Sequence, residues 1–467
     1  MSIPESIEQS LHQHGIHYQR LANAERPMHP LHNTSLLPRN QVGVLVLLGD
    51  HSGFQQVLLC ADSLLDLNRI CEIQCRDLRA LSTEEQQQLA LRNGVESLTA
   101  LPLVGDARLL VDERLTQQER VYLSLPDHSA SLAFTQAEFA KLIEGGKIER
   151  FTIPASPLCD SRQNVEQDDQ TAVEYAVKNF TTLRIHQRLE QTLEMPPLPA
   201  TAERIINLRL DPNAGINELV TLVERDPSLA AQVVSWAASP YYAVSSGIHS
   251  VRDAIVRVLG FDLVINLALG LALGRTLDVP RQGTYGVHAY WTQSVYTAAL
   301  MEGLAKAIPI RQRPQVGLCY LSGLLHNYGY LVLAHVFPPH FAVICRYLAA
   351  NPHLNHGCVE RHVLDLTREQ ISSQLMGSWQ MPAEIVAALR WQNYPAYQGP
   401  HARYAQLLFI ATRLLGREGL MPSSPDAIPA GLMDELGLDP QRAEAALQKV
   451  RENEQDLQGI ARNLAGP

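Results

Sequence analysis

The 467-residue sequence lacks paired cysteine motifs: none of its seven cysteines forms a C-x-x-C pair. An odd, dispersed set of cysteines in a large chain is typical of reduced thiols in a cytoplasm. We therefore expect free thiols and a cytoplasmic location. Cys71 and Cys75 are four residues apart, so on a helix they would share a face, either as two small apolar side chains or as half of a zinc site.

Long hydrophobic runs are also absent. The longest apolar stretch, Leu263–Gly274, is too short to cross a bilayer, which needs about 20 residues, and it predicts a buried helix instead. The N-terminus has neither a basic region nor a long apolar core. We therefore expect no signal peptide and no membrane partner.

Excess positive charge and common catalytic motifs are missing as well. The formal net charge is −10, which argues against sequence-independent binding to nucleic acid. No G-x-S-x-G elbow, P-loop or dinucleotide fingerprint occurs. The composition is otherwise that of a globular protein, with 46% apolar and 18% charged residues, and the length predicts two or three domains.

Residues 1–150 mix strand and helix signals. The apolar runs 42–50 and 54–62 are separated by a short polar turn, which predicts a β-hairpin. Ser82 with Glu85, and Thr135 with Glu138, have the spacing of capping boxes that begin helices. These patterns predict an α+β domain with a mostly antiparallel sheet, in which acidic residues outnumber basic ones.

The remainder of the chain is predicted to be helical. Residues 151–185 are interpreted as a polar linker and a connecting helix, 186–415 as an all-α domain, and 416–467 as an amphipathic helical tail. Asp226 should cap a helix whose first turn holds Pro227. The expected fold class is therefore a two-domain chain, α+β followed by all-α.

The helical domain carries motifs of a known family. They are the "PPLP" segment at 196–199, the helix pair "ELVTLVERDPSLAAQVVSWAAS" and the helix 250–260. In these motifs, over about residues 186–415, the chain resembles the HDOD family, the HD-related output domain of bacterial signalling proteins. The resemblance implies a stack of helices related to the metal-dependent HD phosphohydrolases.

Active members of that superfamily hold one or two divalent ions with His and Asp side chains, and the metal-bound hydroxide attacks a phosphoester. Carried over position by position, the resemblance implies that one ligand survives, His326. The other ligand positions hold neutral or cationic side chains: Gln293, Asn327, Thr367, Arg368, Gln392, Asn393 and Thr412. Since the Arg368 guanidinium would repel a dication, we expect no metal, no other cofactor and no metal catalysis at this site.

Two questions about these residues stay open from the sequence. His326 is a satisfied core or groove residue, a contact for a polar ligand, or a metal ligand. The eight positions either line a polar pocket, in which Arg368 would bind a small anionic ligand, or they hydrogen-bond to one another.

The N-terminal domain resembles the YbaK family, the editing domain associated with prolyl-tRNA synthetase. The resemblance rests on the segments 42–70, 89–112 and 120–143. It implies a mixed sheet with helices and, in active members, hydrolysis of misacylated tRNA by means of a lysine near the start of the first strand. Residues 41–48 contain no lysine, so we expect neither tRNA editing nor tRNA as a partner.

Both resemblances thus imply enzyme folds that have lost their catalytic groups. The sequence is interpreted as a non-catalytic bacterial signalling or regulatory protein. Its N-terminal domain would bind a ligand or partner, and its HDOD-like domain would relay this to other proteins. The alternatives are a residual hydrolase, either an HD-type phosphohydrolase or an aminoacyl-tRNA deacylase, and nucleic-acid binding through the N-terminal domain.

Overall fold

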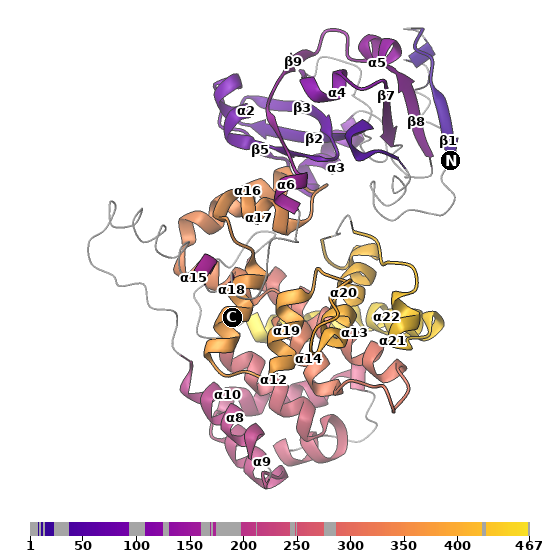
Figure 1. The fold of residues 1–467 in the computed structure, drawn as a ribbon. Coiled ribbons are helices and arrows are strands. Elements are labelled where there is room, and N and C mark those ends of the chain that lie inside the picture. The colour runs from indigo at the N-terminus through magenta and orange to yellow at the C-terminus, as the bar shows by residue number, and fades with distance from the viewer. Residues whose placement is uncertain are drawn as a thin grey trace, which may run out of the picture. The chain divides into compact units, whose positions relative to one another are not determined.

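The protein folds into two compact units in the computed structural model (Figure 1). Unit 1 comprises Met1–Gln163, Ala342–Val363 and Ser424–Ala427, and unit 2 comprises the rest of the chain. The structure describes residues 8, 11–12, 15–22, 37–92, 108–124, 130–159, 169, 171–173, 198–211, 213–242, 248, 250–274, 286–422 and 426–465.

A mixed sheet forms the centre of unit 1. The predicted hairpin is confirmed as β2 (Val42–Asp50) and β3 (Gly53–Cys60), which pair antiparallel. The sheet continues on both sides in the order β1-β8-β7-β2-β3-β6-β9, with β5 paired to β2. Its other strands are β1 (Gln19–Ala22), β5 (Arg79–Ala80), β6 (Leu109–Asp112), β7 (Arg120–Ser124), β8 (Ala130–Thr135) and β9 (Lys147–Glu149).

The sheet was predicted to be mostly antiparallel, but it contains parallel as well as antiparallel strand pairs. The pairs β2–β7, β3–β6 and β6–β9 are parallel, whereas β1–β8, β7–β8, β2–β3 and β2–β5 are antiparallel. A second small sheet pairs β4 (Ser63–Leu65) with β10 (Thr152–Pro154). The expected α+β class with a mixed sheet is confirmed.

Short helices connect the strands of unit 1 and begin at the predicted caps. The Glu85 amide donates to Ser82 Oγ at 3.2 Å, and the Ser82 amide donates to Glu85 Oε2 at 2.7 Å. Thr135 Oγ1 likewise accepts from the Glu138 amide. The helices are α2 (Leu67–Gln74), α3 (Thr83–Arg92), α4 (Glu113–Thr116), α5 (Gln136–Leu142) and α6 (Ser156–Cys159), with the 3-10 turn η2 at Arg39–Gln41.

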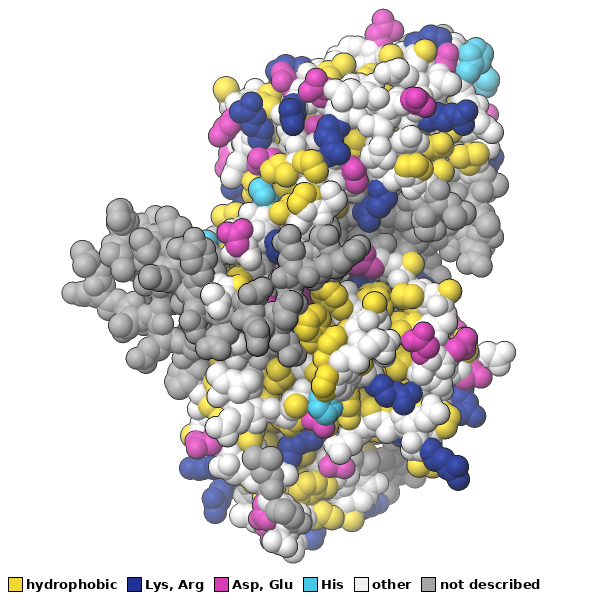
Figure 2. All heavy atoms as spheres, in the orientation of Figure 1, with side chains coloured by type: hydrophobic (Ala, Val, Ile, Leu, Met, Phe, Trp, Pro, Cys, Tyr) yellow, Lys and Arg dark blue, Asp and Glu magenta, His cyan; other side chains and the backbone are white. Residues whose placement is uncertain are grey.

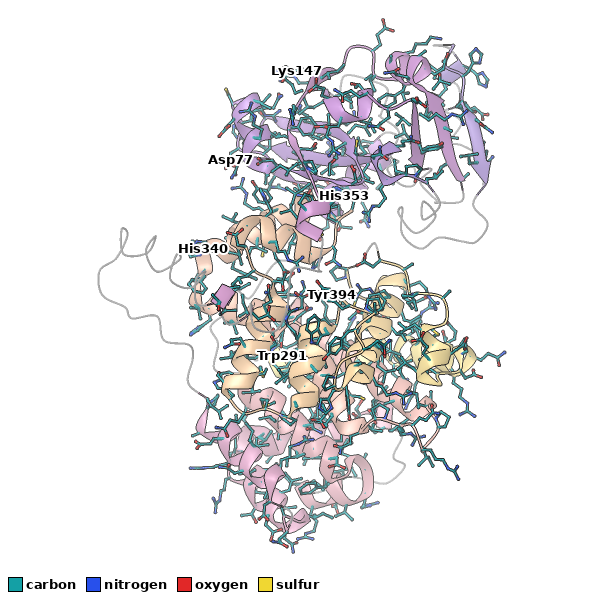
Figure 3. All side chains as sticks on the ribbon, in the orientation of Figure 1. Asp77, Lys147, Trp291, His340, His353 and Tyr394 are labelled. Carbon is teal, nitrogen blue, oxygen red and sulfur yellow. The ribbon has the colours of Figure 1, made fainter. Side chains whose placement is uncertain are left out.

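A segment from the helical half of the sequence, 342–363, folds into unit 1. Asn351 attaches this segment to β4. Its side chain accepts from the Leu65 amide at 2.7 Å and donates to the Leu65 carbonyl at 3.1 Å. His353, which is labelled in Figure 3, has its Nε2 at 2.8 Å from the Ser63 carbonyl. The segment therefore satisfies backbone groups of β4, which are buried and would otherwise be unpaired. It comprises most of α16 (Pro338–Ala350) and α17 (His356–Leu364).

Unit 2 is helical throughout its described residues, as predicted. Asp226 Oδ1 accepts from the amides of Ser228 and Leu229, and Pro227 opens the helix. The helices are α8 (Ala200–Leu210), α9 (Ile216–Glu224), α10 (Pro227–Ala237), η4 (Pro240–Tyr242), α11 (Val251–Asp253), the π-helix η5 (Ala254–Leu259), α12 (Phe261–Gly274), α13 (Val287–Ala307), α14 (Val316–Leu325), α15 (Tyr328–Val336), α18 (Arg368–Ser378), α19 (Ala383–Trp391), α20 (Ala402–Arg417), α21 (Leu432–Leu436), α22 (Pro440–Glu452) and α23 (Glu454–Ala465).

Helix α13 occupies the centre of unit 2 and packs against α14, α20, α22 and α23. Its contact with α14 is close, since a Cβ at Gly323 would lie 2.7 Å from the backbone of Ala298. Glycine is therefore required at this crossing. The crossing fixes the C-terminal end of α14, from which His326 follows.

Three sequence predictions need comment. Cys358 is disulfide-bonded, so the expectation of free thiols is wrong for this residue, whereas Cys71 and Cys75 are free. Part of the predicted linker forms β10 and α6, and the connecting helix predicted there lies almost wholly outside the described residues. Among the described residues, no helix is both long enough and apolar enough to cross a membrane.

Candidate functional site

The eight residues carried over from the HD pattern come from helix ends and helix interiors within unit 2. His326 follows α14, Asn327 precedes α15, and Thr367 caps α18. A Cβ at Gly329 would collide with the Arg368 carbonyl, so the first turns of α15 and α18 touch through their backbones. The remaining members come from α13 (Gln293), the end of α19 (Gln392 and Asn393) and α20 (Thr412).

His326 is the most deeply buried member of this cluster and is 1% exposed. Its Nδ1 is 2.8 Å from the Gly323 carbonyl, and because a carbonyl can only accept, Nδ1 carries the proton. Burial, and to a smaller extent the nearby Arg368 charge, lowers the pKa of His326 to about 4, although the bond to the Gly323 carbonyl opposes that shift. The ring is therefore neutral at pH 7, and its Nε2 lone pair has no partner among the described residues.

Arg368 stands at the position that the HD pattern assigns to a metal-binding histidine. It is 7% exposed, and its Nε donates to Asn327 Oδ1 at 3.2 Å. Its Nη2 lies 3.1 Å from Glu369 Oε1, and its guanidinium lies 4.9 Å from the centre of the Tyr330 ring. Asn327 Nδ2 in turn donates to Gln293 Oε1 at 3.2 Å. The guanidinium is thus held by an amide, a carboxylate and an aromatic face.

The network continues through a carboxylate that the sequence patterns did not single out. Glu369 Oε1 also accepts from Asn393 Nδ2 at 2.6 Å. Arg413 Nη1 donates to Asn393 Oδ1 at 2.9 Å and to Thr412 Oγ1 at 3.0 Å. Glu369 follows Arg368 in the sequence, and Arg413 follows Thr412. A charged residue next to a position identified from the family pattern was therefore the one sequence feature that could have pointed to them.

The two remaining positions support backbone structure. Gln392 Nε2 donates to the His326 carbonyl at 2.9 Å, which ties the end of α19 to the α14–α15 turn. Thr367 forms a capping box with Gln370, whose Nε2 donates to Asp169 Oδ1 at 2.7 Å. Arg390 Nη2 donates to the same carboxylate at 2.8 Å. The predicted residues therefore hydrogen-bond to one another and to their helix ends, and ligand binding at this cluster stays a prediction.

This donor set does not fit the divalent ions that the fold family implies. In the part of the chain that the structure describes, no group of three or more His, Cys, Asp and Glu side chains could hold a metal ion. The nearby Glu369 carboxylate already accepts from Arg368 and Asn393. The Arg368 guanidinium would repel a dication placed there, and an amide oxygen of Asn327 carries no charge to offset this.

The chain was compared with known protein families and solved structures. The HDOD domain family matches residues 195–395. The structure of a "Putative signal transduction protein" from Marinobacter aquaeolei VT8 is 39% identical, aligns with 99% of this chain and 100% of its own, and superposes with a TM-score of 0.87. The chain therefore contains an HDOD domain, at residues 195–395.

One more distant solved structure shares the fold of the HDOD domain, and one curated protein is similar in sequence. An HDOD domain protein of unknown function from Geobacter sulfurreducens is 18% identical, covers 63% of this chain and 98% of its own, and has a TM-score of 0.50. An uncharacterized protein of Treponema pallidum (strain Nichols) is 23% identical over 200 residues. That match spans 43% of this chain and 38% of the length of the relative.

The distribution of charge on the surface is relevant to the alternative that the protein binds nucleic acid. On the face shown in Figure 2, Lys and Arg side chains are interspersed with Asp and Glu, and no broad basic patch is visible among the described residues. Sequence-independent binding of nucleic acid relies on such patches. The tRNA chemistry implied by the YbaK resemblance stays a prediction.

Proposed function

We propose that this HDOD protein is a non-catalytic signalling or regulatory protein that acts by binding other proteins. The observation that carries the proposal is the placement of Arg368, whose guanidinium is held by Asn327 and Glu369 in the site where HD enzymes bind metal. The relationship to a "Putative signal transduction protein" supports the signalling role. A cytoplasmic location is part of the proposal.

The energetics of the buried pair favour a fixed, metal-free cluster. To admit a dication, Arg368 would have to leave Glu369, and both side chains are buried. Breaking a buried ion pair by removing one partner typically costs about 3–5 kcal/mol. The cluster then serves to hold the ends of α14, α18 and α19 in one arrangement.

For the N-terminal unit we propose a ligand- or partner-binding role that influences the HDOD unit. The support is the course of the chain: it passes into unit 1 within α16 and returns to unit 2 within α17. Asn351 and His353 attach this excursion to β4. A change in the position of β4 would therefore move residues that are continuous with HDOD helices.

The test measures metal content and hydrolysis together. The full-length protein is purified without chelators, its transition metals are quantified by mass spectrometry, and hydrolysis of bis(p-nitrophenyl) phosphate is followed with added Mn²⁺. We expect substoichiometric metal and no turnover above that of a protein-free blank. Turnover that persists through repeated purification and falls on His326→Ala would contradict the proposal.

One observation favours the residual phosphohydrolase as the second candidate. The Nε2 lone pair of His326 is buried, unprotonated and without a partner among the described residues, and a histidine held in this tautomer is prepared to bind a metal. About one divalent ion per chain, lost on His326→Gln, would support this candidate.

A further inference from the structure

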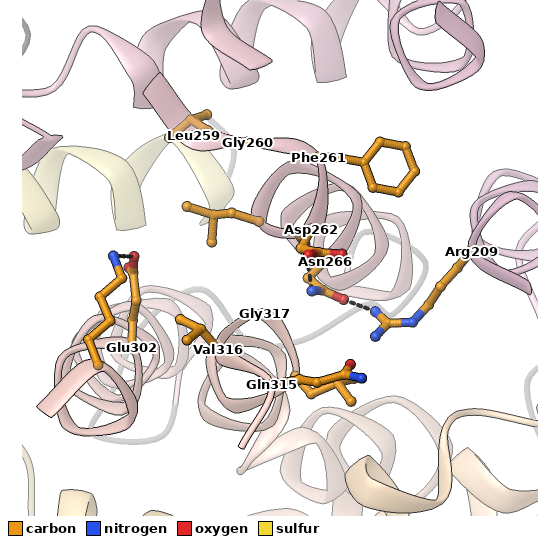
Figure 4. A pocket seen from close by; sticks show the side chains of 13 residues that line it. Arg209, Leu259, Gly260, Phe261, Asp262, Asn266, Glu302, Gln315, Val316 and Gly317 are labelled. Atoms are coloured by element: carbon orange, nitrogen blue, oxygen red, sulfur yellow. Dashed lines mark hydrogen bonds and ion pairs between the residues drawn. The ribbon is translucent and has the colours of Figure 1, made fainter. Parts of the chain in front are cut away.

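A second polar site lies in the HDOD unit, at the N-terminal ends of α12 and α14 (Figure 4). It is a pocket of about 350 Å³, within the range of small-molecule sites. Its lining comes from α8, the junction of η5 with α12, α13 and the start of α14. Neither the family pattern nor the sequence motifs pointed to this pocket.

Arg209 supplies a guanidinium on one side of the pocket (Figure 4). Its Nη1 donates to Asn266 Oδ1, and Asn266 Nδ2 donates to the Asp262 carbonyl at 2.5 Å, which orients the amide. No described residue accepts from the other guanidinium nitrogens. Burial lowers the pKa of Arg209, while the Asp262 carboxylate opposes that shift. The arginine therefore remains a cation beside the pocket, with donors that no described residue uses.

The start of α14 adds backbone donors beside this cation. The helix is ten residues long and begins at Val316, and its N-cap Gln315 makes no side-chain capping bond. Its hydrogen bonds begin where Cys319 donates to the Gln315 carbonyl at 3.0 Å. The amides of Val316, Gly317 and Leu318, which line the pocket, thus have no partner within the helix. Such a helix end attracts negative charge.

Glu302 provides an independent sign of a ligand with a hydrogen-bond donor. It lines the other side of the pocket (Figure 4) and is 5% exposed. Its Oε1 pairs with Lys306 Nζ at 2.5 Å, but its Oε2 has no partner among the described residues. A buried carboxylate oxygen without a donor is costly, so a cationic or hydroxyl group of a ligand would be stabilised there.

We infer that this pocket binds a small zwitterion of the free amino-acid class. The carboxylate of the ligand accepts from Arg209 and the α14 amides, and its ammonium donates to Glu302 Oε2. The pocket's own charges balance, with Arg209 and Lys306 against Asp262 and Glu302. A zwitterion matches this balance, whereas a phosphate dianion would face two carboxylates. The inference concerns a site separate from the His326 cluster and does not rest on the proposed function.

The test is calorimetry and thermal unfolding of the full-length protein with a panel of free L-amino acids at millimolar concentration. Each amino acid is compared with its N-acetyl form, which lacks the ammonium, with its amide, which lacks the carboxylate, and with inorganic phosphate. We expect at least one free amino acid to bind and raise the melting temperature, and both derivatives to bind about tenfold or more weakly.

Two variants locate the binding. Arg209→Met should weaken binding by about tenfold to hundredfold, because a charge-assisted hydrogen bond is lost. Arg204→Met, on the exposed face of the same helix, is the matched control and should leave binding unchanged. If no amino acid binds, if both derivatives bind as well as the parent, or if phosphate alone binds, the inference is wrong. The comparison of ligand forms on the unaltered protein decides even if Arg209→Met does not fold.

Discussion

Arg368 Nε donates to Asn327 Oδ1 at 3.2 Å, so two positions that the HD pattern assigns to metal-binding side chains are hydrogen-bonded to each other. The two residues are in contact although they stand 41 positions apart. An aspartate at 327 would have formed an ion pair with the same guanidinium. Most polar groups of the described residues in this cluster therefore pair with one another.

Removal of the guanidinium should destabilise unit 2. Arg368→Ala leaves Glu369 buried with one donor fewer and opens space over Tyr330. We expect the free energy of unfolding to fall by about 3–5 kcal/mol, measured by urea denaturation. The exposed Arg204→Ala should change it by less than about 0.5 kcal/mol. Equal stability of the two variants would show that the network does not support the fold.

Stability should rise with pH between about 4 and 6.5 because of His326. Its folded pKa is about 4, below the ordinary value of 6.5, so the unfolded chain binds more protons in this window. The stabilisation is complete above pH 6.5 and is lost as the pH falls toward 4.

Thermal unfolding scans across this pH range measure the effect. His326→Gln should flatten the pH dependence of the melting temperature, whereas His288→Gln, at an exposed site on α13, should leave it unchanged. His353 has a pKa lowered to about 4 by burial and contributes in the same direction, so His353→Gln should also flatten the curve. A profile that His326→Gln leaves unaltered would contradict the assigned neutral tautomer.

Metal binding at the His326 cluster should appear only when the Arg368 cation is removed and metal-binding side chains are introduced together. Asn327→Asp alone places a carboxylate beside Arg368, and the two should pair, so no affinity for Co²⁺ is expected. The double variant Asn327→Asp with Arg368→His removes the cation and adds an imidazole. We expect it to bind Co²⁺, followed by its visible absorption spectrum. Binding by the single variant would show that repulsion by Arg368 is not the barrier.

The packing of segment 342–363 within unit 1 should depend on Asn351. Asn351→Ala leaves the Leu65 amide and carbonyl without their side-chain partner. We expect the free energy of unfolding of unit 1 to fall by about 2–4 kcal/mol, and hydrogen exchange at Leu65 to accelerate. Asn68→Ala, an exposed neighbour on α2, is the control and should have little effect. Slow exchange at Leu65 in Asn351→Ala would mean that another group covers β4.

Local patterns in the sequence predicted most of the elements. The caps at Ser82, Thr135 and Asp226 form as expected, because such bonds join residues two or three apart. The hairpin of β2 and β3 is likewise local. The parallel neighbours β7 and β6 were not predictable, since parallel pairing joins strands across long connections and leaves no periodic trace.

The candidate site shows the same division. The family resemblance located all eight positions, but the partners that hold them, Glu369 and Arg413, became visible in the folded chain alone. Asp169 bonds to Arg390 across 221 positions, and His353 to Ser63 across 290. Contacts at such separations depend on the packing of whole elements. The pocket at Arg209 is of this kind, because four separate segments line it.

The most direct test of the central claim is a crystal of the full-length protein soaked in Mn²⁺, with anomalous scattering recorded at the manganese edge. We predict no anomalous density near His326 and an Arg368 guanidinium that still contacts Asn327 and Glu369. An ion bound to His326 Nε2 at a coordination distance of roughly 2.0–2.3 Å, with Arg368 displaced, would contradict the account.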